Sequence, residues 1–285
     1  MPNDLEAKAD YLERFYHEQG IKTVRLRFTW RGIPQSIVIG MIPGSLPAGK
    51  NRPVLLADHY DTAFAEDVFK KVNQRVAVPG ANDNATATAT LLMAAKHLKA
   101  GKNAHDIWLV NLPGEEYPAD DLGIRWLVRN LLFLPPAKWE STDPETLAFL
   151  KAHYRSPWTG MFLLDMLGHH RRGDTKFQIN PGEGTAAASL AGIAAGAAKD
   201  TAPSLQALVR PPHTPVSYLA NTDGDVLDKI GIPVVFFNEP TNFTNYMAAK
   251  HYHESDDVIH HVDIPFSAKI ARTAIESTAR AASQP

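Results

Sequence analysis

The sequence predicts a single α/β domain built around a mainly parallel sheet. Short apolar runs typical of buried strands alternate along the chain with longer segments of helical periodicity. No repeat, low-complexity tract or linker divides the 285 residues, so we expect residues 1–285 to form one domain. Hydrophobic residues make up 44% of the chain and charged residues 21%, a composition that supports a full core and excludes wholesale disorder.

The N-terminal half begins with apolar residues at helical spacing over 4–19, which predict an amphipathic helix that ends at Gly20. Apolar and polar residues alternate over 24–28, which predicts a strand with one solvent-exposed face. Residues 53–57 form a short apolar run, typical of a strand buried on both faces. The other elements predicted in this half are a strand over 36–42, a helix over 84–99, a strand over 105–111 and a helix over 121–132.

The C-terminal half is expected to start with an insertion at about 134–158, rich in proline and tryptophan and containing its own short helix. Small residues at helical spacing predict a helix over 186–198. The remaining predicted elements are strands over 160–164 and 232–237 and a closing helix over 266–282.

Charge and cysteine content exclude several classes of function. The formal net charge of −2 gives no electrostatic footprint for nucleic acid or an anionic membrane. The absence of cysteine excludes disulfide scaffolds, thiolate zinc sites and cysteine nucleophiles. Twelve histidines remain as a supply of metal ligands or bases.

The chain is expected to be soluble. No apolar run is long enough to span a bilayer. The N-terminal residues lack the basic and apolar regions of a signal peptide, although a processed, exported form would look the same. Neither the compartment nor the oligomeric state follows from the sequence.

Acidic and imidazole side chains collect where predicted strands end. In open α/β sheets, sites form beyond the carboxyl ends of the strands. Each group alone has a simpler interpretation, such as a helix cap or a solvated charge. Five such segments at one edge are harder to explain in that way, because their carboxylates would repel one another unless cations neutralise them. The residues concerned are His59 and Asp61, Asp83, Glu115 and Glu116, Asp165, and His253.

Imidazole and carboxylate groups without thiolate fit catalytic zinc or a similar divalent ion. Two ions need about five protein ligands. Glu115 is then left over beside the metals. Adjacent side chains in an extended stretch point to opposite sides, so Glu115 can handle a proton while Glu116 binds metal. The five candidate ligands are His59, Asp83, Glu116, Asp165 and His253.

Five motifs in this order and spacing resemble the co-catalytic di-zinc aminopeptidases of the bacterial leucyl aminopeptidase type. Relatives of that family include glutaminyl cyclases, glutamate carboxypeptidases and the transferrin-receptor ectodomain. The resemblance implies a zinc-exopeptidase fold, a single domain with a central mixed, mostly parallel sheet flanked by helices on both faces. The motifs are LLADHYDT at 55–62, PGANDNATA at 79–87, PGEE at 113–116, LLDMLG at 163–168 and YHESDD at 252–257.

The resemblance also implies roles for individual residues. Two zinc ions would be bound per chain. His59 and Asp165 would hold the first ion, Glu116 and His253 would hold the second, and Asp83 would bridge the two. Asp61 would orient His59, Glu115 would be the general acid and base, and Tyr252 is a candidate for stabilising the oxyanion. The resemblance further implies a strained peptide bond just after Asp83, before Asn84.

The sequence departs from the family pattern in three places. Thr86-Ala87 stands where the family usually has Ser-Gly, which we expect to be a packing change. Thr222-Asp223-Gly224 stands where the family commonly has a Ser-Asp-His element. The segment between Glu116 and Asp165 is longer than in compact members, so the insertion is expected to form either a lid or specificity wall, or else a surface elaboration. Residues 169–172 are expected to be a solvated loop, with substrate contact as the alternative. We do not expect His251, His260 or His261 to be metal ligands.

The leading hypothesis is therefore a zinc-dependent exopeptidase, an aminopeptidase acting on a peptide or an amino-acid amide through a di-zinc-activated water and Glu115. Glutaminyl cyclisation is the nearest alternative, but such relatives typically lack the first histidine, which is present here as His59. Carboxypeptidase or other amidohydrolase activity remains open. The intact ligand set argues against a catalytically dead, metal-binding interaction domain. The two histidines and the lack of a phosphate-binding loop argue against a magnesium phosphoesterase. The preferred N-terminal residue and the physiological substrate are not predicted.

Overall fold

The computed structural model describes residues 2–169 and 173–284. Within this part of the chain, one sheet of eight strands has the order β1-β2-β4-β3-β5-β8-β6-β7. The strands are β1 (Lys22–Trp30), β2 (Ile33–Ile42), β3 (Val54–His59), β4 (Ile107–Leu112), β5 (Gly160–Leu164), β6 (Lys176–Pro181), β7 (Gln206–Val209) and β8 (Val234–Asn238).

The centre of the sheet is parallel and its flanks contain antiparallel pairs. Strand β3 pairs in parallel with β4 and with β5, and β5 pairs in parallel with β8. The antiparallel pairs are β1–β2, β2–β4 and β6–β8, whereas β6–β7 is parallel. Every residue of β3, β4, β5 and β8 is buried, as expected for strands covered on both faces. The predicted mixed, mostly parallel sheet is confirmed.

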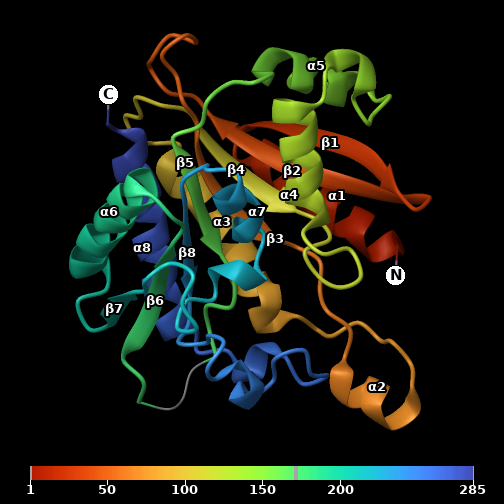
Figure 1. Ribbon diagram of the computed structural model, residues 1–285, viewed down its shortest axis with the longest axis vertical. Helices are drawn as coiled ribbons and strands as arrows, with labels where there is room; N and C mark the ends of the chain where they lie inside the picture. Colours follow the sequence, from red (N-terminus) through yellow and green to blue (C-terminus); the bar gives the residue numbers. More distant parts are fainter. Residues whose placement is uncertain (1, 170–172, 285) are drawn as a thin grey trace.

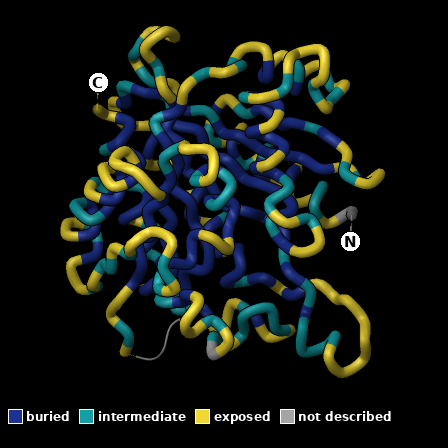
Figure 2. The backbone as a smooth tube through the Cα atoms, viewed as in Figure 1, coloured by how far each residue is buried: buried dark blue, intermediate teal, exposed yellow. Residues whose placement is uncertain are grey.

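Helices cover both faces of this sheet (Figure 1). One face packs against α1, α3, α6 and α8, and the other packs against α4, α5 and α7. Figure 2 shows the buried sheet enclosed by partly exposed outer segments. Among the described residues, none of the helices combines the length and apolar character needed to cross a bilayer. The helices are α1 (Pro2–Glu18), α2 (Glu66–Val72), α3 (Thr86–Leu98), α4 (Leu122–Val128), α5 (Pro144–His153), α6 (Thr185–Thr201), α7 (Gly224–Lys229) and α8 (Ile264–Ala282).

Four observed elements have no counterpart among the predicted ones: α2, α7, β6 and β7. Helix α2 has no buried residue and β7 has only partly buried or exposed ones, so neither carries the apolar periodicity that predicts an element. Helix α3 begins at Thr86 rather than at 84, because residues 81–85 form an irregular turn in which Asp83 and Asn84 have non-helical backbone angles.

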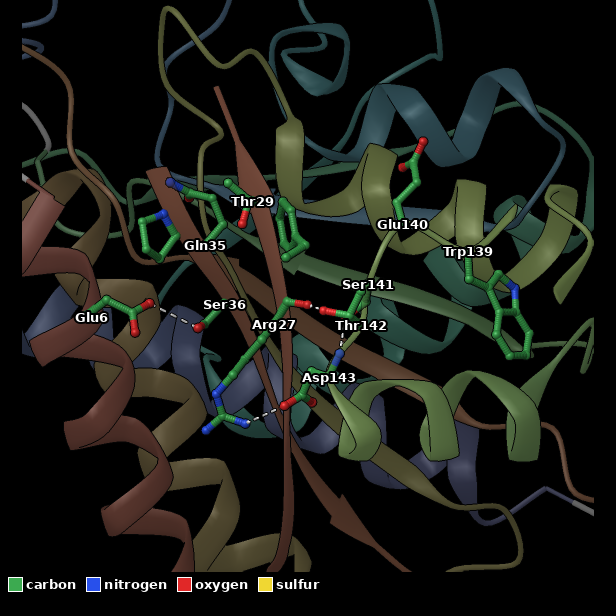
Figure 3. Close-up of a pocket in the computed structure, with 12 residues that line it drawn as sticks. Glu6, Arg27, Thr29, Gln35, Ser36, Trp139, Glu140, Ser141, Thr142 and Asp143 are labelled. Atoms are coloured by element: carbon green, nitrogen blue, oxygen red, sulfur yellow. Dashed lines mark hydrogen bonds and ion pairs between the residues drawn. The ribbon is translucent and has the colours of Figure 1, made fainter. Parts of the chain in front are cut away.

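The segment predicted as an insertion, residues 134–158, packs along the edge strand β1 (Figure 3). The backbone N–H of Arg27 donates to Thr146 Oγ1 at 2.8 Å, and the Ser141 hydroxyl donates to the Arg27 carbonyl at 2.7 Å. The Arg27 guanidinium also lies 3.8 Å from Asp143 Oδ1. These contacts cover backbone groups that an exposed edge strand would leave unpaired.

Candidate metal centre

The predicted site residues meet at the carboxyl edge of the parallel strands. His59 is the last residue of β3, and Asp165 directly follows β5. Glu115 and Glu116 come shortly after β4, whereas Asp83 lies in the turn before α3. His253 belongs to the long segment between β8 and α8, drawn in blue beside α2 in Figure 1. The fold therefore brings all five predicted ligands and Glu115 to one place.

The five ligands form two clusters that share Asp83. In the first, His59 Nε2 lies 3.3 Å from Asp83 Oδ1 and 3.4 Å from Asp165 Oδ1. In the second, His253 Nε2 lies 3.3 Å from Asp83 Oδ2 and 3.3 Å from Glu116 Oε1. Each oxygen of Asp83 thus faces a different histidine, which is the arrangement of a bridging carboxylate.

The residues present fit metal ions. His59 is only 2% exposed, yet neither of its ring nitrogens has a hydrogen-bond partner among the described residues. The same is true of one oxygen each of Asp83 and Asp165. Unpartnered buried polar atoms are costly and call for an explanation. In each cluster, one ligand atom from each residue lies within 4.8 Å of the others, and the imidazole–carboxylate chemistry suits zinc.

The electrostatics of the centre are those of crowded, buried carboxylates. Burial raises the pKa of Glu115 well above its usual value, and the charges of Glu116 and Asp165 add to the shift. Burial and the charge of Asp83 raise the pKa of Glu116 to about 7. For Asp83, burial opposes ionisation, but the close imidazoles of His253 and His59 outweigh it and lower the pKa. Cations at the two clusters would relieve this repulsion.

Asp61 contacts both the His59 imidazole and the backbone of Glu115 and Glu116. Its Oδ1 lies 3.5 Å from His59 Nδ1, as the resemblance led us to expect. The same carboxylate accepts the backbone N–H of Glu115 at 3.2 Å and that of Glu116 at 3.1 Å. Sequence reasoning missed this second role, which fixes the position of the Glu115–Glu116 pair.

Asp257 holds the turn that presents Asp83, and sequence reasoning assigned it no role. Its Oδ1 accepts the backbone N–H of Asn82 at 2.9 Å, and its Oδ2 accepts that of Asp83 at 3.1 Å. Its position in the motif at 252–257 was the only available signal. Asn84 secures the other side of the turn, because its amide donates to the Leu164 carbonyl at 3.0 Å. The Asp83–Asn84 peptide bond is cis, at the position that the resemblance singled out.

A cavity of about 410 Å³ opens beside the two clusters. Glu115 lines it, with Oε2 4.0 Å from His59 Nε2, but belongs to neither cluster. Tyr252 also lines it; its ring stacks on that of His253 with centroids 3.9 Å apart, and its hydroxyl accepts a hydrogen bond from the Tyr218 hydroxyl at 3.3 Å. The cavity is further lined by Tyr117, Asp120, Asp121, Arg125, Ala220, Asn221, Thr222 and Asp225.

The predicted insertion does not reach this cavity. None of residues 134–158, all of which the structure describes, lines it. Trp139 instead donates its indole N–H to the Asn130 carbonyl at 2.9 Å, and its ring packs against Tyr154. Of the alternatives left open by the sequence, this placement supports a surface elaboration rather than a lid. In the loop predicted at 169–172, residues 170–172 lie outside the described residues.

Asp223 is a buried carboxylate near the centre. It belongs to the Thr222-Asp223-Gly224 element, which differs from the family pattern. It is 1% exposed, and neither of its oxygens has a hydrogen-bond partner among the described residues. Burial and the neighbouring charge of Asp121 raise its pKa well above the usual value for an aspartate. Its charge in turn contributes to the raised pKa of Glu115.

Comparisons with known proteins agree with this geometry. The model of peptidase family M28 matches residues 38–278. No curated protein matches the chain significantly.

Solved structures share the fold at low sequence identity. The Legionella pneumophila LapA aminopeptidase is 15% identical, with a TM-score of 0.67 over 100% of this chain and 64% of its own. BSAP, a zinc aminopeptidase from Bacillus subtilis, is 18% identical, with a TM-score of 0.64 over 90% of this chain and 52% of its own. The Fimbriiglobus ruber glutaminyl cyclase is 18% identical, with a TM-score of 0.68 over 98% of this chain and 88% of its own. The chain therefore spans less than two thirds of the length of the two aminopeptidases.

Proposed function

The chain belongs to peptidase family M28 and is a metallopeptidase, and we propose that it is a zinc-dependent aminopeptidase that removes the N-terminal residue from peptides. The observation that carries the proposal is the division of the Asp83 carboxylate between two histidines, each in a separate ligand cluster beside Glu115. The zinc aminopeptidase among the structural neighbours supports the choice of metal and of substrate.

Two zinc ions per chain are proposed. His59 and Asp165 would hold one ion, Glu116 and His253 would hold the other, and Asp83 would contribute one oxygen to each. When bound, such a pair of ions lowers the pKa of a water molecule and polarises the scissile carbonyl.

Glu115 is the proposed general base. Its carboxylate faces the cavity beside both clusters without being part of either, so it is free to exchange a proton. It would take the proton of the attacking water and return it to the leaving amine as the peptide bond breaks. Asp61 would keep Glu115 in place through the Glu115 backbone N–H, and would orient His59.

Tyr252 is proposed to stabilise the oxyanion that forms at the carbonyl carbon. Because its hydroxyl accepts a hydrogen bond from Tyr218, its own proton remains available for donation toward the cavity. A donor placed at the developing negative charge is among the strongest contributions to catalysis. Stacking on His253 would hold the Tyr252 ring beside the second cluster.

Glutaminyl cyclisation is the second candidate, because the Fimbriiglobus ruber glutaminyl cyclase shares the fold over most of both chains. The complete first cluster around His59 favours hydrolysis instead. Peptides with N-terminal leucine and N-terminal glutamine, analysed by mass spectrometry with and without a chelator, separate the two. We expect chelator-sensitive loss of the N-terminal residue. If the glutaminyl peptide loses ammonia and neither peptide loses its N-terminal residue, the proposed activity would be glutaminyl cyclisation instead.

A further inference from the structure

A second group of imidazoles lies in the segment between β8 and α8, outside the two clusters that share Asp83. The rings of His251 and His261 stack with centroids 4.0 Å apart and planes 12° apart. His251 Nδ1 lies 2.8 Å from Asp256 Oδ2. One ligand atom from each of these three residues lies within 4.8 Å of the others. The three residues therefore offer two imidazoles and one carboxylate at a single point.

Two of these three side chains, those of Asp256 and His261, are exposed and accessible to an ion from solvent. The side chain of Asp256 is 57% exposed, and within the described part of the chain the His261 imidazole has no hydrogen-bond or ion-pair partner. On the buried side, the ring of His169 lies 5.3 Å from that of His251. The side chain of His169 is only 10% exposed, and its Nε2 lies 3.5 Å from Asp257 Oδ1. The candidate ligand group is therefore bounded by His169 on its buried side and open on the side of His261 and Asp256.

Contrary to the expectation from the sequence for His251 and His261, we propose from this arrangement that His251, Asp256 and His261 form a further metal site, separate from the catalytic centre, that takes Zn²⁺ or a similar transition-metal ion. Two imidazoles and a carboxylate are a donor set that zinc accepts, with water in the open position. Tetrahedral zinc with Zn–N distances of about 2.0–2.1 Å places its ligand atoms roughly 3.3 Å apart. The ligand atoms now lie within 4.8 Å of one another, so binding would require the exposed His261 and Asp256 side chains to rotate toward a common point.

An ion at this site would act on the segment that completes the catalytic centre. That segment also carries His253, a proposed catalytic ligand, and Asp257, which holds the turn presenting Asp83. Linking His251 and Asp256 to His261 would restrain both residues. The site would therefore be structural, and we expect it to slow the release of the catalytic ions to a chelator. This inference goes beyond the proposed activity and does not depend on it.

The test compares bound zinc in three proteins. Metal-free wild-type protein, H261Q and H260Q are dialysed to equilibrium against the same buffered concentration of free Zn²⁺, and zinc per chain is then measured. H260Q is the matched control, because it also removes one histidine, and His260 belongs to none of the ligand groups. We expect H261Q to bind one equivalent fewer than wild type, and H260Q to bind the wild-type amount.

Equal binding by H261Q and wild type would overturn the proposal, as would an equal loss in H260Q. D256N provides a second variant and is also expected to lose one equivalent. The readout is a difference in zinc content at the same free Zn²⁺ concentration, and it requires no catalytic activity. The zinc that H261Q retains reports separately on the two proposed catalytic ions, so failure of the proposed function and failure of this inference can be told apart. Matching circular dichroism spectra of the metal-free proteins establish that the variants fold.

Discussion

Asp61 lies with its Oδ1 3.5 Å from Nδ1 of His59, on the side of the imidazole away from Asp83. The same carboxylate accepts the backbone N–H groups of Glu115 and Glu116. One buried side chain therefore sets the orientation of a proposed metal ligand and the position of the proposed base.

Replacing Asp61 by asparagine should weaken the centre without removing a ligand. The amide has a single acceptor oxygen, so it cannot serve both backbone N–H groups and orient the imidazole as a carboxylate does. We expect a loss of about 10–100-fold in zinc affinity or activity, the scale found for residues that orient metal ligands. Zinc titration and kcat/KM measure the two effects. Wild-type values of both in D61N would show that Asp61 has no positioning role.

E115Q should retain its metals and lose most of its turnover. The glutamine amide keeps the size of the side chain but cannot accept the proton of the attacking water. The expected decrease in kcat is about 10²–10⁴-fold, the usual contribution of a general base. E140Q, in the insertion, is the matched control and should behave as wild type. Near-normal turnover of E115Q with full zinc content would rule out the role proposed for this residue.

D83A and D165A should differ in how much zinc they lose. Asp83 offers one oxygen to each cluster, whereas Asp165 belongs to one cluster alone. We therefore expect D83A to lose both catalytic ions and D165A to lose one, at a free zinc concentration that fills the wild-type centre. Zinc analysis after equilibrium dialysis gives the result. Loss of the same amount of zinc from both variants would mean that Asp83 does not bridge.

D257N should lower stability even in the metal-free protein. Both oxygens of the buried Asp257 carboxylate accept backbone N–H groups of the turn, and asparagine can satisfy only one of them. Leaving a buried N–H unpaired costs about 1–3 kcal/mol in the free energy of unfolding. Urea denaturation of metal-free wild type and D257N measures the difference. A free energy of unfolding equal to that of wild type would exclude this account of Asp257.

W139A should affect stability but not catalysis. The indole N–H of Trp139 donates to the Asn130 carbonyl, and its ring packs on Tyr154. None of these three residues lines the cavity beside the metal ligands. We expect a lower Tm with kcat/KM unchanged. A change in kcat/KM that differs between substrates of different size would instead show that the segment at 134–158 contributes to substrate specificity.

Much of the fold could be predicted because buried parallel strands leave uninterrupted apolar runs, as in β3 and β5. Strand β7 and helix α2 could not, because they lie at the periphery and bury little apolar surface. The candidate ligands were identifiable because strand ends converge in this class of fold. The roles of Asp257 and of Asp61 toward the Glu115–Glu116 backbone depend on hydrogen bonds between segments distant in sequence, which no local pattern records.

The central claim is metal-dependent removal of an N-terminal residue. The most direct test is hydrolysis of a panel of aminoacyl amides with free amines, each beside its N-acetylated counterpart, before and after chelation and after return of zinc. We predict cleavage of the free-amine substrates alone, lost on chelation and restored by zinc. Cleavage that persists in the metal-free protein, or no cleavage by the zinc-loaded protein of any free-amine substrate, would contradict it.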